Sequence, residues 1–387
     1  YSMLSGLYVH QHMGWSNHCT LPSGLPTFPG ILRQNGYATK AVGKMHFTPT
    51  YLDVGFSEME LAEQHGPGRW DDDYHRYLRD HGLADGLDLI DQRAEYREHA
   101  PEQYWETFGA MESDLPEEHH STSWIGNRAV DSLRNWDSGG PNLLMVGFIK
   151  PHHPHDPPSP WSEMYDPAEL SLLPGWTEEV PARDVERSRG YFPNDKLTES
   201  SMRRIMAMYY ANVSHIDGQV GRMIQVLKDS GQYENTMIVY TSDHGDYLGY
   251  HHMGLKGNAL YEGTMRVPLI IKYPGGTQGG RDSEALVNNV DLAPTILGQT
   301  GCECPSQFFD LDLDPWEMKD LYEVPDRQEE IQDLRDRLVH WRLFESRSPT
   351  HLDETAPIID RPNARRAGDG HREPIRGYYR NQVMPGR

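Results

Sequence analysis

The sequence predicts an α/β fold, with a mostly parallel central sheet flanked by helices and a small α+β C-terminal part. Two observations predict it. Short runs of β-forming or apolar residues alternate with segments of helical period up to about Gly301, where the pattern changes. Strands that alternate with helices in this way are typical of parallel sheets covered by helices on both faces.

The first predicted elements are short. Residues 27–34 have the pattern of a helix, and Asn35-Gly36 is a turn signal. Residues 38–42 predict a strand that runs into Gly43-Lys44-Met45-His46. Residues 55–120 are polar with acidic clusters, so loops are expected there.

The middle of the chain carries stronger patterns. Residues 121–136 predict a helix with Ser or Thr as its N-cap. The apolar run 142–148 predicts a strand buried on both faces. Residues 198–229 predict an amphipathic helix, because apolar residues recur three or four positions apart. These residues are Ile205, Tyr209, Val213, Ile216, Val220, Ile224 and Leu227.

Two further strands and a helix complete the pattern. Residues 236–241 are rich in β-formers and lead into Ser242-Asp243-His244-Gly245, and residues 267–273 predict another buried strand. Residues 326–346 predict a helix with one apolar face. The end of the chain is rich in Arg and Pro without periodicity, so we expect a surface tail.

Composition excludes some classes of protein. The formal net charge is −22, which argues against nucleic acid as a partner because that binding depends on basic patches. No apolar stretch approaches the roughly 18 residues of a transmembrane helix, so no membrane span is expected. Three Cys residues are too few for a disulfide framework and leave the compartment open.

Four short segments concentrate reactive side chains, and each ends or follows a predicted strand or lies shortly after one. They are Gly43–His46, Lys150–His155, Ser242–Gly245 and 251–257, which includes Lys256. Taken alone, each also fits an ordinary surface loop. Ligands of open α/β sheets gather beyond the carboxyl ends of strands. Because the segments hold three of only eight lysines, a single anion- and metal-binding site explains them better than chance.

The order of these motifs resembles the sulfatase family of the alkaline-phosphatase-like superfamily. The resemblance covers about residues 1–345. Its further landmarks are Leu4-Ser5-Gly6-Leu7-Tyr8, Asn35-Gly36-Tyr37, Arg266-Val267-Pro268-Leu269, Asp291-Leu292-Ala293-Pro294-Thr295 and Asp310 through Glu317.

The resemblance implies hydrolysis of aryl or sugar sulfate monoesters through a formylglycine nucleophile and one divalent cation. Ca²⁺ is the expected ion and Mn²⁺ the alternative. Asp243 and His244 would be metal ligands. Lys44 and Lys256 would hold sulfate oxygens and stabilise the charge that develops in the transition state.

Two histidines receive roles from the same resemblance. His46 would assist the formylglycine hydroxyls in the breakdown of the sulfated intermediate. His152 would contact the leaving oxygen or act as a general acid.

The resemblance also implies sequence that this chain does not contain. In the family, a Cys or Ser in C-x-P-S-R becomes formylglycine, and this motif and the strand with paired Asp ligands are expected upstream of Tyr1. The sulfatase-like domain at 1–303 is therefore expected to be N-terminally incomplete. Cys19 lies in a run with the wrong spacing and is interpreted as a loop cysteine. Residues 304–346 are interpreted as the remnant of a C-terminal subdomain with one helix, and 347–387 as the tail.

Two alternatives stay open. One is a phosphonate or phosphate ester hydrolase on the same scaffold, because the Asp-His pair occurs in both groups. The other is an inactive anion-binding remnant, because the nucleophile is absent. A C-x-P-S-R motif in the coding sequence upstream of Tyr1 would favour the enzyme, and its absence would favour the remnant. The expected partner is a small-molecule or saccharide sulfate ester. The oligomeric state is undetermined, and only the resemblance suggests a periplasmic, secreted or lysosomal compartment.

Overall fold

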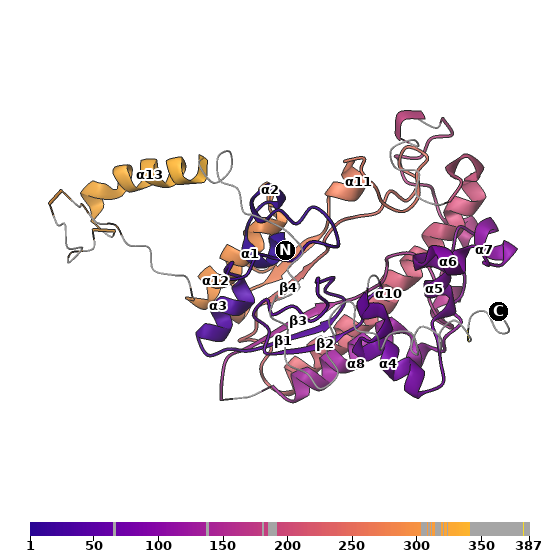
Figure 1. Cartoon of the computed structure of the whole chain (residues 1–387), viewed down its shortest axis with the longest axis horizontal. Coiled ribbons are helices and arrows are strands. Elements are labelled where there is room, and N and C mark those ends of the chain that lie inside the picture. Colours follow the sequence, from indigo (N-terminus) through magenta and orange to yellow (C-terminus); the bar gives the residue numbers. More distant parts are fainter. Residues whose placement is uncertain are drawn as a thin grey trace.

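The computed structural model describes residues 1–64, 67–136, 139–179, 182–184, 192–302, 308, 310, 312–313, 319, 321–322, 324–340 and 382. Two small sheets lie at the centre, with helices above and below them (Figure 1). In these segments no helix is long and apolar enough to cross a membrane.

The larger sheet is parallel. Strand β1 (Ala38–Gly43) lies between β2 (Glu58–Leu61) and β3 (Asn142–Gly147), and both neighbours run parallel to it. Strand β4 (Ile238–Thr241) pairs antiparallel with β5 (Leu269–Lys272) in a second sheet. The predicted α/β class is therefore confirmed, as are the four strands expected at β1, β3, β4 and β5.

Helices cover both faces of the parallel sheet (Figure 1). On one face α8 (Ser121–Arg134) packs against α10 (Glu199–Asp229) and contacts β1 and β3. On the other, α3 (Phe28–Gln34) contacts β1 and packs with α1 (Ser2–Ser5) and α12 (Leu292–Thr300). The helices predicted over 27–34, 121–136 and 198–229 are thus confirmed.

Side-chain caps explain where two of these helices begin. Thr27 Oγ1 accepts a hydrogen bond from the Gly30 amide at 3.2 Å at the start of α3. Thr198 and Ser201 form a reciprocal capping box at the start of α10. The prediction for α8 was wrong in its cap, because His120 Nδ1 accepts from the Thr122 amide at 3.2 Å.

Residues 55–120 are more regular than predicted. They contain β2, α4 (Asp73–Asp80), α5 (Gly86–Gln92), α6 (Ala94–Arg97) and α7 (Glu102–Glu106). Acidic residues interpreted as parts of loops cap two of these helices. Asp72 accepts from the His75 amide at 2.7 Å, and Asp85 accepts from the Asp88 amide at 3.1 Å. The loop prediction was wrong because such short helices depend on caps and packing rather than on periodicity.

Burial also departs from the prediction in one place. All six residues of β3 are half-buried rather than buried on both faces, because β3 borders a large cavity. By contrast the Trp70 and Tyr74 side chains are only 4% and 1% exposed, and each packs in a hydrophobic core.

The remaining elements are short or lie near the end of the chain. Helix α13 (Gln328–His340) confirms a helix for the described part of 326–346; residues 341–346, 303–307 and nearly all of 347–387 lie outside the described residues, so the domain boundaries stay predictions. The other elements are α2 (Val9–His12), α11 (Glu262–Met265), η1 (Pro67–Trp70), η2 (Glu117–His119), η3 (Trp161–Glu163), η4 (Pro167–Glu169), η5 (Asn194–Lys196), η6 (Pro274–Gly276), η7 (Asn289–Asp291) and η8 (Pro325–Arg327).

Candidate active site

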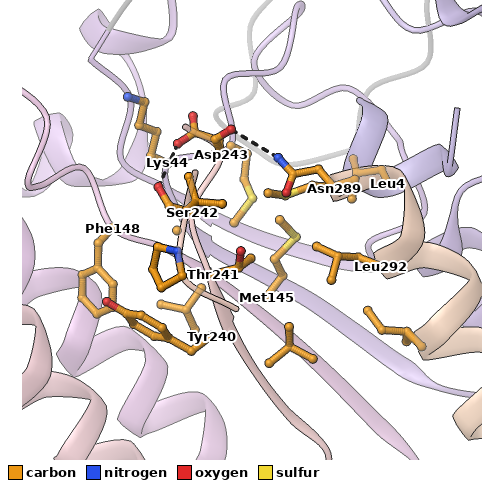
Figure 2. Close-up of a pocket in the computed structure, with 18 of the residues that line it drawn as sticks. Leu4, Lys44, Met145, Phe148, Tyr240, Thr241, Ser242, Asp243, Asn289 and Leu292 are labelled. Carbon is orange, nitrogen blue, oxygen red and sulfur yellow. Dashed lines mark hydrogen bonds between the residues drawn. The ribbon is translucent and has the colours of Figure 1, made fainter. Parts of the chain in front are cut away.

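One cavity of about 1790 Å³ brings the predicted site residues together. Strand β3 lines it with Met145 and strand β4 with Tyr240 and Thr241, and Leu4 and Leu292 also line it (Figure 2). Its polar end lies where the strands finish. The six residues predicted to act there all line this cavity: Lys44, His46, His152, Asp243, His244 and Lys256.

The ends of the strands place these side chains. Strands β1 and β3 are parallel and in register, with Gly43 opposite Gly147, so the segments that follow them leave the same edge of the sheet. Gly43 has a φ of 91°, and a Cβ there would lie 2.1 Å from the Gly147 carbonyl oxygen. Only glycine fits this close approach. Lys44 therefore starts directly at the sheet edge, beside the end of β3.

Asp243 and His244 follow β4, and Lys256 joins them from the loop after residue 250. Asp243 Oδ2 and His244 Nε2 are 3.5 Å apart, and Lys256 Nζ is 2.6 Å from His244 Nε2. The Asn289 side chain donates to the Asp243 carbonyl at 3.2 Å, as Figure 2 shows. His244 Nδ1 lies 2.8 Å from the Gly245 carbonyl, which can only accept. Nδ1 therefore carries the proton, and the lone pair of Nε2 accepts from Lys256 Nζ.

These residues meet only part of what a divalent cation needs. The tautomer of His244 and the adjacent Asp243 carboxylate suit a metal ligand pair. However, no group of three or more His, Cys, Asp or Glu side chains able to hold a metal occurs among the described residues, and Ca²⁺ takes about six to eight oxygen ligands. The described side chains therefore do not form a complete metal site by themselves.

Burial keeps the two site histidines neutral. It lowers the pKa of His46 to about 4, with the charges of Lys44 and Lys256 acting in the same direction. It also holds the pKa of His152 well below its ordinary value, helped by His153 and Lys44. His152 Nδ1 is 2.7 Å from the His153 carbonyl and must donate to it, so Nε2 is left as an acceptor.

The lysines carry positive charge close to each other. Burial lowers the pKa of Lys44, while Asp243 opposes the shift. Burial and then the charge of Lys44 lower the pKa of Lys256 to about 8. The pKa of Asp243 is lowered, because His244, Lys44 and Lys256 outweigh the effect of burial. Two ammonium groups that repel each other favour an anion between them.

Lys150 was grouped with the site lysines on sequence grounds, and it lines the same cavity, but its charge is paired with another side chain. Its ammonium forms an ion pair with Asp156, and both side chains are almost completely buried. It also donates to the Pro154 carbonyl at 3.0 Å. Lys150 therefore holds the loop after β3 together instead of presenting its charge to a ligand.

Two residues at the site have no motif that could have revealed them. Gln64 Oε1 accepts from Lys44 Nζ at 3.1 Å, and Glu63 Oε1 accepts from the amides of Met45 and His46. Both lie in the segment predicted as loop. Only the register of β2 against β1 brings them to the site.

Known proteins are similar to this chain in sequence. The sequence model of the family described as "Sulfatase" matches residues 1–302. An arylsulfatase of Clostridium perfringens is 30% identical over 74% of this chain and 60% of its own length. An N-acetylglucosamine-6-O-sulfatase of Bacteroides thetaiotaomicron is 26% identical over 81% of this chain and 60% of its own length. The match thus spans about three fifths of each relative.

A solved structure is similar to this chain in fold. The crystal structure of a phosphonate monoester hydrolase of Agrobacterium radiobacter superposes with a TM-score of 0.62 at 19% identity, covering 93% of this chain and 89% of that one. At this level of identity the likeness concerns the fold alone.

Proposed function

The chain belongs to the sulfatase family, and from this premise we propose that the whole protein hydrolyses sulfate monoesters of aryl or sugar alcohols. The observation that supports this most is the convergence of two lysines and two neutral histidines on one cavity end. Such a set binds a tetrahedral anion and moves protons beside it.

Lys44 and Lys256 bind the sulfate oxygens in this proposal. Each ammonium carries three N–H groups, so Lys44 can hold Gln64 and still donate to an anion. The negative charge on sulfate oxygens and leaving oxygen grows as the ester bond breaks. Preorganised ammonium groups in a partly dry site stabilise that charge without reorganisation.

His46 and His152 handle protons. Neutral His46 acts as a base that helps to break down the sulfated intermediate. His152 faces the leaving oxygen with Nε2, where the negative charge of the bound sulfate ester raises its pKa and lets it take up and deliver a proton. This second role depends on the anion, because burial alone keeps His152 neutral.

The proposed chemistry also needs a divalent cation and a formylglycine nucleophile, and the described residues supply only two ligands of the cation. Asp243 and His244 would contribute two ligands to a divalent cation, Ca²⁺ or alternatively Mn²⁺, which would neutralise charge on the sulfate. The formylglycine nucleophile is proposed to come from a C-x-P-S-R motif ahead of Tyr1.

A small or terminal sulfate ester is the proposed substrate. The two relatives are named for aryl sulfates and for N-acetylglucosamine 6-O-sulfate. With a net charge of −22 the chain repels long polyanions at low salt, although fields beyond roughly 8 Å are screened at physiological ionic strength.

The test is a comparison of substrates with the complete gene product. We expect kcat/KM to be higher for 4-nitrophenyl sulfate or glucosamine 6-sulfate than for 4-nitrophenyl phenylphosphonate. A Lys44→Met variant that stays folded should lose this turnover. Turnover of phosphonates or phosphodiesters but not sulfates would overturn the proposal in favour of a phosphonate or phosphate ester hydrolase.

The second alternative, an inactive anion-binding remnant, has its own discriminating outcome. It requires that the coding sequence ahead of Tyr1 lack C-x-P-S-R and that the gene product bind sulfate without turnover.

A further inference from the structure

Two consecutive residues, Glu63 and Gln64, form hydrogen bonds with the segment that carries Lys44 and His46. Strands β1 and β2 are paired with Gly43 opposite Leu61, and the Ala62 amide donates to the Gly43 carbonyl at 3.1 Å. The residues that follow the two strands therefore leave the sheet side by side. Glu63 and Gln64 are 2% and 0% exposed and lie against Lys44, Met45 and His46.

Glu63 holds the backbone of this segment. Its Oε1 accepts from the Met45 amide at 3.0 Å and from the His46 amide at 2.9 Å. His46 has a φ of 61°, a left-handed conformation that is strained for a non-glycine residue and persists only where the surrounding structure holds it. Glu63 Oε1 stabilises this conformation, because it accepts hydrogen bonds from two consecutive amides.

Gln64 holds the side chain of Lys44. Its Oε1 accepts from Lys44 Nζ at 3.1 Å, while its Nε2 donates to Asp88 Oδ1 at 2.8 Å and to the His153 carbonyl at 3.2 Å. This amide orientation is fixed by chemistry, since an ammonium only donates, and a carboxylate and a carbonyl only accept. Asp88 is itself held by a buried ion pair with Arg69.

Gln64 also links two parts of the site. The His153 carbonyl that receives Gln64 Nε2 also receives His152 Nδ1 at 2.7 Å. One buried amide thus lies between the lysine after β1 and the histidine after β3.

We propose that Glu63 and Gln64 are positioning residues, which set Lys44 and His46 in the geometry that binds the sulfate oxygens. They touch no substrate; they act through the residues they hold. The proposal rests on the proposed function for what Lys44 binds, but the contact between Gln64 and Lys44 is independent of it.

The first experiment is a double-mutant cycle on the affinity of the chain for inorganic sulfate, measured by isothermal titration calorimetry. Gln64→Met should weaken binding about tenfold, since a hydrogen bond to a charged group is lost. In a Lys44→Met background the same substitution should change affinity by less than about twofold, because its effect passes through Lys44. An equal loss in both backgrounds would overturn the proposal, because it indicates a general structural role.

A matched control tests the specificity of the contact. Gln92 Nε2 donates to the same His153 carbonyl at 3.0 Å. The variant Gln92→Met should therefore leave sulfate affinity within about twofold of the unsubstituted chain. For Glu63, the conservative Glu63→Gln keeps an acceptor for the two amides and should retain binding, whereas Glu63→Leu should lose it. Equal loss in both Glu63 variants would contradict the role given to Oε1.

A second readout separates this proposal from the proposed function. If the complete gene product binds no sulfate, the proposed function fails, and the role of Gln64 is judged by acylation of Lys44 followed by mass spectrometry. Gln64→Met should change the rate of Lys44 labelling at least about threefold relative to Lys272, while Gln92→Met should not. Unchanged Lys44 labelling in Gln64→Met would overturn the proposal.

Discussion

Glu63 should make the stability of the protein depend on pH in a defined window. Burial is the largest cause that raises its pKa, from an ordinary 4.5 to about 7, against the opposing hydrogen bonds from His46 and Met45. The folded protein therefore keeps a proton that the unfolded chain releases between about pH 4.5 and 7. Since one pKa unit corresponds to about 1.4 kcal/mol, this group lowers the free energy of unfolding by about 3 kcal/mol as pH rises through that window.

The variant Glu63→Gln removes this titration while keeping the shape of the side chain. We expect it to match the unsubstituted chain near pH 4.5 and to be more stable by up to about 3 kcal/mol at pH 8. Urea denaturation followed by tryptophan fluorescence at pH 5, 6, 7 and 8 measures the difference. Other buried acids are present in both proteins, so the difference in their free energies of unfolding isolates the contribution of Glu63.

The control for this experiment is Glu58→Gln on strand β2, which Glu63 follows. The Glu58 side chain is 71% exposed and lies 3.5 Å from Lys40, so its substitution should change the free energy of unfolding by less than about 1 kcal/mol. A stability difference between Glu63→Gln and the unsubstituted chain that stays constant from pH 5 to 8, or falls as pH rises, would refute the reasoning.

Three further predictions concern single residues. Lys150→Met should destabilise the protein by about 3–5 kcal/mol in urea denaturation, because it leaves Asp156 buried without its cation. The sulfate affinity of the folded variant should be unchanged. Weakened binding would indicate that Lys150 contacts the anion. Lys256→Met should weaken sulfate binding about 10- to 100-fold by calorimetry, whereas Lys272→Met, which removes a lysine bonded to backbone carbonyls, should not. Gly43→Ala should lower the melting temperature more than Gly36→Ala. Both glycines have a positive φ, but of the two only Gly43 would bring a Cβ against a backbone oxygen. Equal decreases in melting temperature would contradict the close approach of Gly43 to Gly147.

The sequence predicted those parts of the fold and site that depend on local pattern. The stripe of α10 and the runs at β1, β3, β4 and β5 are visible in a window of a few residues. The six site residues lie in short segments directly after strands or in a nearby loop, and their order along the chain resembles that of one family. The structure places all six on one cavity.

The remaining features depend on contacts between segments that are distant in the sequence. Gln64 lies 20 residues from Lys44, and only the register of β2 against β1 makes them neighbours. Lys150 resembles the other site lysines in sequence, but the fold turns it to Asp156. The half-burial of β3 likewise depends on what surrounds the strand rather than on its apolar composition.

The central claim is that Lys44 and Lys256 bind one tetrahedral anion beside His46 and His152. The most direct measurement is a crystal structure of the protein soaked with tungstate, whose anomalous signal locates the ion. We expect a peak within hydrogen-bond distance of both ammonium groups, and we expect it to be absent in Lys44→Met. A peak elsewhere, with none between these two lysines, would contradict it.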